Sequence, residues 1–129
     1  MDKKELLKGY IESNVAPILL DFISSETLTD AVVIPANISV KKLCGHYSDT
    51  EYLPPKWYTQ LCSKENNRIL LIDKIDSVEK EEQLKFVEIL KYRKVSTFEL
   101  PEDCVIILTA DKVNRDTVSE EILSLVAKI

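Results

Sequence analysis

Glycine is scarce in this sequence, with 2 residues among 129, and they stand far apart as Gly9 and Gly45. A loop that wraps its main-chain amides around phosphates needs closely spaced glycines in the pattern G-x-x-x-x-G-K-[ST], because only glycine lets the backbone approach so near. No such motif can be written onto these residues. The composition therefore excludes a phosphate loop of that type within this chain.

Cysteine and histidine are also few. The 3 cysteines, Cys44, Cys62 and Cys104, are widely spaced and form no C-x-x-C pair, so they indicate neither a disulfide framework nor a zinc site. Cys104 opens an apolar run, and we expect it to be a small buried side chain. The single histidine, His46, has no second His or Glu at ligand spacing. We expect no metal centre built on these residues.

Positive charge is in deficit, with 17 Lys and Arg against 22 Asp and Glu and a net charge of −5. Binding to nucleic acid needs a concentrated basic face, so we expect no nucleic-acid partner. The apolar run VAPILLDFI contains Pro17 and Asp21 and is too short to cross a bilayer, and the charged first residues do not resemble a secretory signal. We expect a cytoplasmic protein with no membrane contact.

The remaining composition, 45% hydrophobic and 30% charged, is typical of one globular domain over residues 1–129. Short β-branched or fully apolar runs predict strands at AVVIPA, at 69–73 and at 105–109. Apolar spacing and capping residues predict helices over 1–14, 17–23, 56–62, 77–93 and 116–127. Alternating strands and helices predict an α/β fold with right-handed crossovers and a mostly parallel sheet of about three strands.

Acidic side chains follow the two apolar strands of the second half. Asp73 ends the strand at 69–73, and Asp76 and Asp111 follow closely after the two strands. The carboxyl edge of an open α/β sheet is where ligands bind, and three carboxylates there could hold Mg²⁺ through water. The same residues could equally be ordinary strand-end and helix-capping side chains.

Several segments resemble the core of AAA+ ATPases, in particular the MoxR-type branch. RILLIDKID is similar to a Walker B strand, and LPEDCVIILTAD is similar to the stretch that leads into the sensor-1 strand. VVIPANISVKKLCGHY and TEYLPPKWYTQL resemble the two segments that precede Walker B. The resemblance implies a three-layer, P-loop-NTPase-like sandwich, with the amino-terminal helix at 1–14 in place of the first strand and the phosphate loop.

The departures from that family concern its nucleotide site. By the resemblance, Asp73 matches the Walker B magnesium ligand, Lys74 stands where a catalytic glutamate is usual, and Asp111 replaces the sensor-1 asparagine. Thr109 ends the sensor-1-like strand at 105–109, and the resemblance implies that it also faces the nucleotide. Lysine cannot accept a proton at neutral pH unless burial lowers its pKa greatly. The resemblance also implies an arginine that stabilises a neighbour's phosphate, but Leu125 stands at that position. It implies a lid domain after this segment as well, and residues 1–129 do not contain one.

These departures favour a catalytically inactive domain that acts through protein–protein contacts or self-association, with no cofactor. One alternative is a nucleotide-binding or ATPase fragment completed by a partner subunit, in which Asp73 would hold Mg²⁺ beside ATP. Another is an unrelated small α/β domain, flavodoxin-like or receiver-like, in which Asp73 is a lone acidic site with Lys112 as a charged neighbour.

Two further hypotheses concern particular side chains. Lys74 and Asp111 could form an ion pair that fills the vacant site, or each could point to water. Tyr52, Trp57 and Tyr58 surround Pro54 and Pro55 and could form an exposed interaction surface, although such aromatic residues more often anchor a loop to the core. A sheet without its first strand would also expose an edge for self-association unless the amino-terminal helix covers it.

Overall fold

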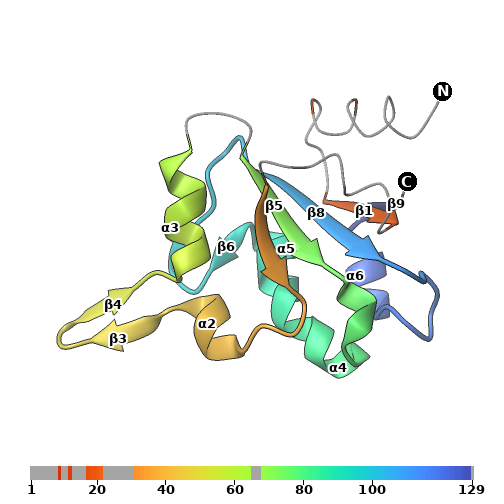
Figure 1. The fold of residues 1–129 in the computed structure, drawn as a ribbon, viewed down its shortest axis with the longest axis horizontal. Coiled ribbons are helices and arrows are strands. Elements are labelled where there is room, and N and C mark those ends of the chain that lie inside the picture. Colours follow the sequence, from red (N-terminus) through yellow and green to blue (C-terminus); the bar gives the residue numbers. More distant parts are fainter. Residues whose placement is uncertain (1–8, 10–11, 13–16, 22–30, 65–67, 129) are drawn as a thin grey trace.

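A five-stranded parallel sheet forms the centre of the molecule, in the order β2-β5-β8-β1-β9 (Figure 1). The structure is a computed structural model that describes residues 9, 12, 17–21, 31–64 and 68–128. The strands are β1 (Ile18–Asp21), β2 (Val32–Pro35), β5 (Ile69–Asp73), β8 (Val105–Ala110) and β9 (Ala127–Lys128). The predicted α/β class and parallel sheet are confirmed, whereas the expected number of about three strands was too low.

The helices between residues 40 and 123 pack on one face of this sheet. They are α2 (Val40–Cys44), α3 (Lys56–Ser63), α4 (Lys80–Gln83), α5 (Val87–Tyr92) and α6 (Glu120–Leu123), with short 3-10 turns η2 (Ile75–Ser77) and η3 (Leu84–Phe86). Their buried apolar residues form one cluster with Leu70 and Ile72 of β5. Leu71, which points to the opposite face, joins a second buried cluster with Ile107 of β8. Burial on both faces explains why these strands are apolar without alternation.

Two small antiparallel hairpins lie in segments for which the sequence predicted no strand. β3 (His46–Ser48) pairs with β4 (Glu51–Leu53). β6 (Lys94–Val95) pairs with β7 (Phe98–Glu99). Short strands of two or three residues bury too little of one face to leave a period-2 pattern in the sequence.

The prediction of a helix over 17–23 was wrong where the structure describes it. Ile18–Asp21 is strand β1, which lies between β8 and β9. Ile18 and Leu20 are buried in one cluster and Leu19 in the other, so this run lies between two apolar layers rather than on one helical stripe. We expected the sheet to lack its first strand and to expose an edge there. Instead β1 occupies an interior position between β8 and β9, so that expectation was wrong. Of the predicted helix at 1–14, only Gly9 and Glu12 lie among the described residues, and both are helical.

The helix predicted over 56–62 is confirmed as α3, whereas the two helices predicted over 77–93 and 116–127 are shorter than expected. The expected helix over 77–93 is broken into α4, the 3-10 turn η3 and α5, and Ser77 belongs to the preceding turn η2. The expected helix over 116–127 is reduced to the four residues of α6, which Ser119 caps by accepting a bond from the Ile122 amide. None of the helices in the described part of the chain has both the length and the apolar character needed to span a bilayer.

Candidate functional site at the carboxyl edge of the sheet

The adjacent strands β5 and β8 end at a hydrogen-bonded rim. The Thr109 hydroxyl donates to Oδ1 of Asp73 at 2.8 Å, and the Lys74 amide donates to the same hydroxyl at 2.8 Å. Thr109 is fully buried, whereas Asp73 is half-buried. One hydroxyl therefore connects the ends of the two central strands and fixes the Asp73 carboxylate. The two strands pair in parallel, so their carboxyl ends lie side by side.

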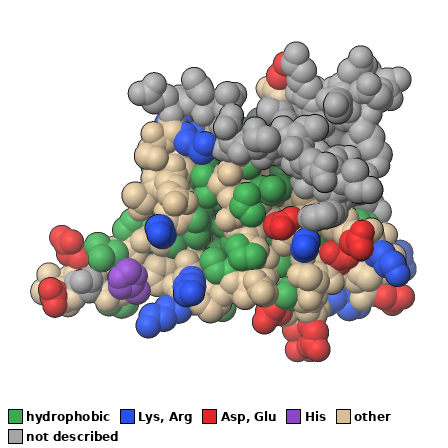
Figure 2. Space-filling view, viewed as in Figure 1, with side chains coloured by type: hydrophobic (Ala, Val, Ile, Leu, Met, Phe, Trp, Pro, Cys, Tyr) green, Lys and Arg blue, Asp and Glu red, His purple; other side chains and the backbone are tan. Residues whose placement is uncertain are grey.

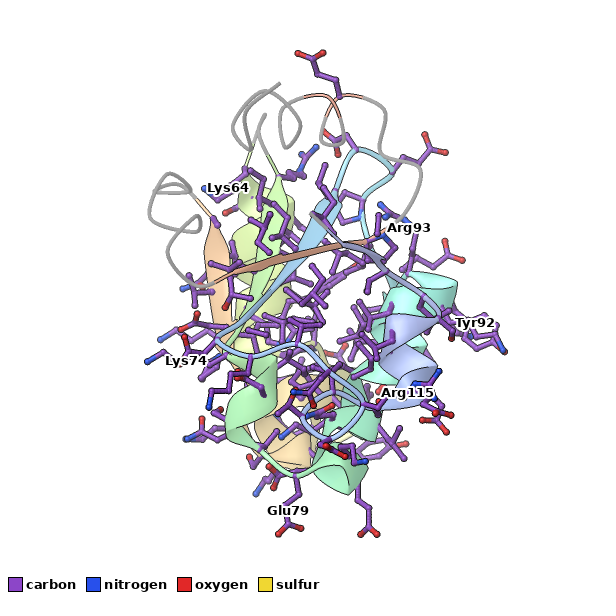
Figure 3. All side chains as sticks on the ribbon, turned by 90° about the vertical axis from the view of Figure 1, so that its right-hand side faces the viewer. Lys64, Lys74, Glu79, Tyr92, Arg93 and Arg115 are labelled. Carbon is purple, nitrogen blue, oxygen red and sulfur yellow. The ribbon has the colours of Figure 1, made fainter. Side chains whose placement is uncertain are left out.

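Lys74 adopts a left-handed backbone conformation directly after β5, with φ 57° and ψ 57°. Its carbonyl accepts the Ser77 amide at 2.9 Å and the Ser77 hydroxyl at 2.7 Å. A residue with a Cβ is uncommon in this conformation, and these bonds hold it there. Figure 3 shows Lys74 at the rim, on the opposite side of the molecule from Tyr92. Hydrogen bonds from Ser77 and to Thr109 hold the main chain of Lys74 in this turn.

Asp76 uses its carboxylate to cap the loop after β8. Its Oδ2 accepts the amides of Asp111 at 3.1 Å and of Lys112 at 2.9 Å. Within the described residues, no set of three His, Cys, Asp or Glu side chains could hold a metal ion, so the three-carboxylate magnesium site is not formed there. The alternative role that the sequence left open, that of a capping side chain, describes Asp76.

Lys74 and Asp111 come from neighbouring strand ends and line one cavity of about 320 Å³ together with Asp76 and Ser77. The sequence resemblance placed these two residues in a common site, and the fold brings them to the same rim. A direct ion pair between their side chains stays a prediction. The role of Asp73 as a magnesium ligand, and of Thr109 beside a nucleotide, is likewise not tested by this geometry.

A buried glutamine joins the rim to the helices beneath it. Gln83 is fully buried, and its Nε2 donates to the carbonyls of Ile75 at 2.9 Å and Thr117 at 2.8 Å. Its Oε1 accepts the Ser119 amide at 2.9 Å. Both turns that follow the central strands are therefore attached to one side chain. Sequence pattern does not indicate this role, because a glutamine in a charged helix is usually exposed.

The three aromatic residues proposed as an interaction surface bind other parts of the same chain. Trp57 is buried, and its Nε1 donates to the Leu43 carbonyl at 2.9 Å. The Tyr52 hydroxyl donates to the Cys44 carbonyl at 2.6 Å, and that of Tyr58 donates to the Glu99 carbonyl. Burial raises the pKa of Tyr58 above its ordinary value, and Cys62 adds to this effect. Through these hydrogen bonds the three aromatic side chains anchor the hairpins and helices to each other.

A second concave surface lies between α2, the β3-β4 hairpin and α3. It has a volume of about 610 Å³ and includes the side chains of Lys41, Lys42 and Lys56 above Pro54, Pro55 and Trp57. We call this surface the basic groove. Figure 2 shows this face, where the histidine in purple lies beside blue lysine side chains and green hydrophobic ones. The sequence does not indicate this groove, because a hairpin separates Lys56 from Lys41 and Lys42 and the three lysines form no single basic run.

Comparison with known proteins gives a fold and no family. No family model matches the chain, and no curated protein matches it. Among solved structures, the chain is similar to a crystal structure of NtrX from Brucella abortus, with a TM-score of 0.55 and 15% identity. The match covers 97% of this chain and 35% of the NtrX chain, so this chain spans about a third of that structure. At this identity the likeness shows the fold alone.

These comparisons overturn the recognition of an AAA+ ATPase core. The matched structure supports an α/β fold with a parallel sheet flanked by helices, and none of the three comparisons places the chain in the AAA+ family. The motif-like segments are short apolar strands followed by polar residues, a pattern that many α/β sheets share. A small α/β domain outside that family agrees better with these findings. The first strand, β1, lies between β8 and β9, which differs from the flavodoxin-like order, where it lies between the second and third strands.

Proposed function

We propose that this chain is a non-catalytic α/β domain that acts by binding another protein, with no cofactor and no ATP hydrolysis. The observation that carries the proposal is the use of the rim carboxylates. Asp73 accepts the Thr109 hydroxyl, and Asp76 accepts two amides of the loop after β8. Carboxylates that accept hydrogen bonds from the chain's own hydroxyl and amide groups support a structural role at the edge where a ligand would otherwise bind.

Exposed apolar side chains support contact with a protein. Val40 of α2 is 61% exposed and Tyr47 of β3 is 80% exposed, and both belong to the elements that form the basic groove. Both side chains flank the groove in sequence, next to its lining residues Lys41 and His46, and large exposed apolar side chains are available for contact with a protein. Self-association is the other form that such a contact could take.

A nucleotide-binding domain completed by a partner subunit is the second candidate. The position of Asp73 at the carboxyl end of β5 favours it, because ligands of open α/β sheets bind at that edge. A three-layer sandwich of the P-loop NTPase type also stays a prediction. The strand order of the sheet, with β1 between β8 and β9, is the observation to compare with that architecture.

Calorimetric titration with ATP and Mg²⁺ tests the absence of nucleotide chemistry. We expect no saturable heat, and we expect ATP hydrolysis no faster than that of Asp73→Asn. Micromolar binding, or hydrolysis that Asp73→Asn abolishes, would favour the second candidate and refute the proposal.

Affinity capture tests the protein contact. The native protein is compared with Val40→Ser/Tyr47→Ser and with a matched control, Leu84→Ser/Tyr92→Ser, which changes two other exposed apolar residues. We expect one protein to be retained by the native and control chains and lost from the first variant. Equal retention by all three chains would show that this surface does not carry the contact.

A further inference from the structure

We infer that the basic groove binds an acidic peptide segment of a partner protein. This inference rests on the proposed function and assigns the site and the chemistry of the contact. Lys41 and Lys42 of α2 and Lys56 of α3 all line the groove, and its described lining contains no Asp or Glu. The occupant is therefore expected to carry negative charge.

The sign of this surface is opposite to that of the whole chain. The protein has a net charge of −5, yet the groove gathers three lysines from two helices. A local positive field on an acidic protein attracts acidic segments and repels basic ones. General acidity of the chain also disfavours long polyanions such as nucleic acid, whose backbone would extend beyond the groove.

The apolar lining of the groove indicates a peptide rather than a simple anion. Pro54, Pro55 and Trp57 line the groove together with Ile38, so it can bury an apolar side chain as well as bind a negative charge. A volume of about 610 Å³ lies within the range of roughly 300 to 1,000 Å³ that is usual for specific sites. The fitting segment therefore combines acidic residues with apolar ones.

Hydrogen bonds hold the walls of the groove in place before any ligand arrives. The indole of Trp57 donates to the Leu43 carbonyl, which attaches α3 to α2. The hydroxyl of Tyr52 donates to the Cys44 carbonyl, which attaches the hairpin to the end of α2. Gly45 has φ +92°, and a Cβ there would clash with the Leu53 carbonyl oxygen. Such preorganisation lowers the entropy lost on binding.

Fluorescence anisotropy with a labelled peptide of alternating Glu and Leu tests the inference. The native chain is compared with Lys41→Glu/Lys56→Glu and with the control Lys91→Glu/Lys94→Glu, which makes the same change in net charge on α5 and β6. We expect the groove variant to bind about tenfold more weakly and the control to bind nearly as the native chain does. Lys41→Gln/Lys56→Gln should give an intermediate loss, and circular dichroism checks that each variant is folded.

Equal weakening in the groove and control variants would overturn the inference, because net charge alone would then explain binding. Stronger binding of an oligonucleotide of equal charge would also overturn it. So would sedimentation that shows the native chain self-associating through these lysines, if the peptide then no longer binds. If the peptide fails while Val40→Ser/Tyr47→Ser still abolishes protein capture, the groove inference fails and the proposed function stands. Binding of ATP and Mg²⁺ that depends on Asp73 would instead refute the proposed function.

Discussion

The hydroxyl of Thr109 lies 2.8 Å from Oδ1 of Asp73 and donates to it, while it accepts the Lys74 amide at the same distance. The two residues end adjacent parallel strands, and Thr109 is fully buried. This bond orients the carboxylate to which the sequence resemblance had assigned a metal. It also secures the left-handed turn at Lys74, on which the geometry of the rim depends.

Replacing Thr109 with Val should destabilise the protein by about 1 to 3 kcal/mol, because the Lys74 amide and the Asp73 carboxylate both lose a partner. Thr109→Ser keeps the hydroxyl and should cost less. Urea unfolding of the two variants measures the difference. Equal stability of the Val and Ser variants would show that the hydroxyl contributes little to the rim.

The two glycines should respond in opposite ways to alanine. Gly45 has φ +92° and no room for a Cβ beside the Leu53 carbonyl, so Gly45→Ala should cost roughly 1 to 3 kcal/mol or more. Gly9 is helical, and beyond its chain neighbours and its own helical backbone no atom lies within 4 Å of the position that a Cβ would take, so Gly9→Ala should be neutral or stabilise by up to about 1 kcal/mol. Thermal unfolding measures both, and a harmless Gly45→Ala would contradict the described hairpin geometry.

Stability should fall in alkaline solution because of Cys104. Burial raises the pKa of its thiol from 9.0 to about 11, although Arg93 acts in the opposite direction. The unfolded chain then loses this proton first, so the contribution is complete below pH 9 and is lost as pH rises toward 11. The change should be on the order of 2 kcal/mol.

Cys104→Ala should therefore show a shallower loss of stability above pH 9 than the native chain. Cys62→Ala is the control, because Cys62 is exposed and has the smallest of the effects that act on the pKa of Cys104. Urea unfolding below pH 9 and near pH 11 provides the comparison. The same slope in the native chain and in Cys104→Ala would contradict the predicted linkage.

A double-mutant cycle tests the predicted pair between Lys74 and Asp111. Both side chains are exposed at one cavity, so a direct pair should have a coupling energy of about 0.2 to 1 kcal/mol. The cycle uses Lys74→Ala, Asp111→Ala and the double variant in low salt. A coupling energy of zero would show that these two side chains do not stabilise each other.

The sequence predicted the strands β5 and β8, which are apolar on both faces, and it left open the role of Trp57 as an anchor to the core. β5 and β8 lie where their apolar runs indicated, and Trp57 is buried, which agrees with the anchoring role that the sequence left open. β1 was mistaken for a helix because Pro17 before an apolar run fits a helix start as well as a strand start. Local pattern could not decide this, since burial between two layers is a tertiary property.

The candidate site was predicted only in part. The residues Asp73, Lys74, Thr109 and Asp111 do gather at one edge, because adjacent parallel strands bring their carboxyl ends together. The contacts of Asp76 and Gln83 could not be predicted, since both depend on loops that meet across more than thirty residues of sequence. The basic groove was missed for the same reason: a hairpin folds Lys56 toward α2.

The most direct test of this account is a nuclear magnetic resonance titration of the labelled chain, first with ATP and Mg²⁺ and then with the Glu-Leu peptide. We predict that the peptide shifts the amide signals of Lys41, Lys42 and Lys56, and that the nucleotide leaves those of Asp73, Lys74 and Asp111 unchanged. Saturable nucleotide-induced shifts at Asp73, Lys74 and Asp111, with none from the peptide in the groove, would contradict the account.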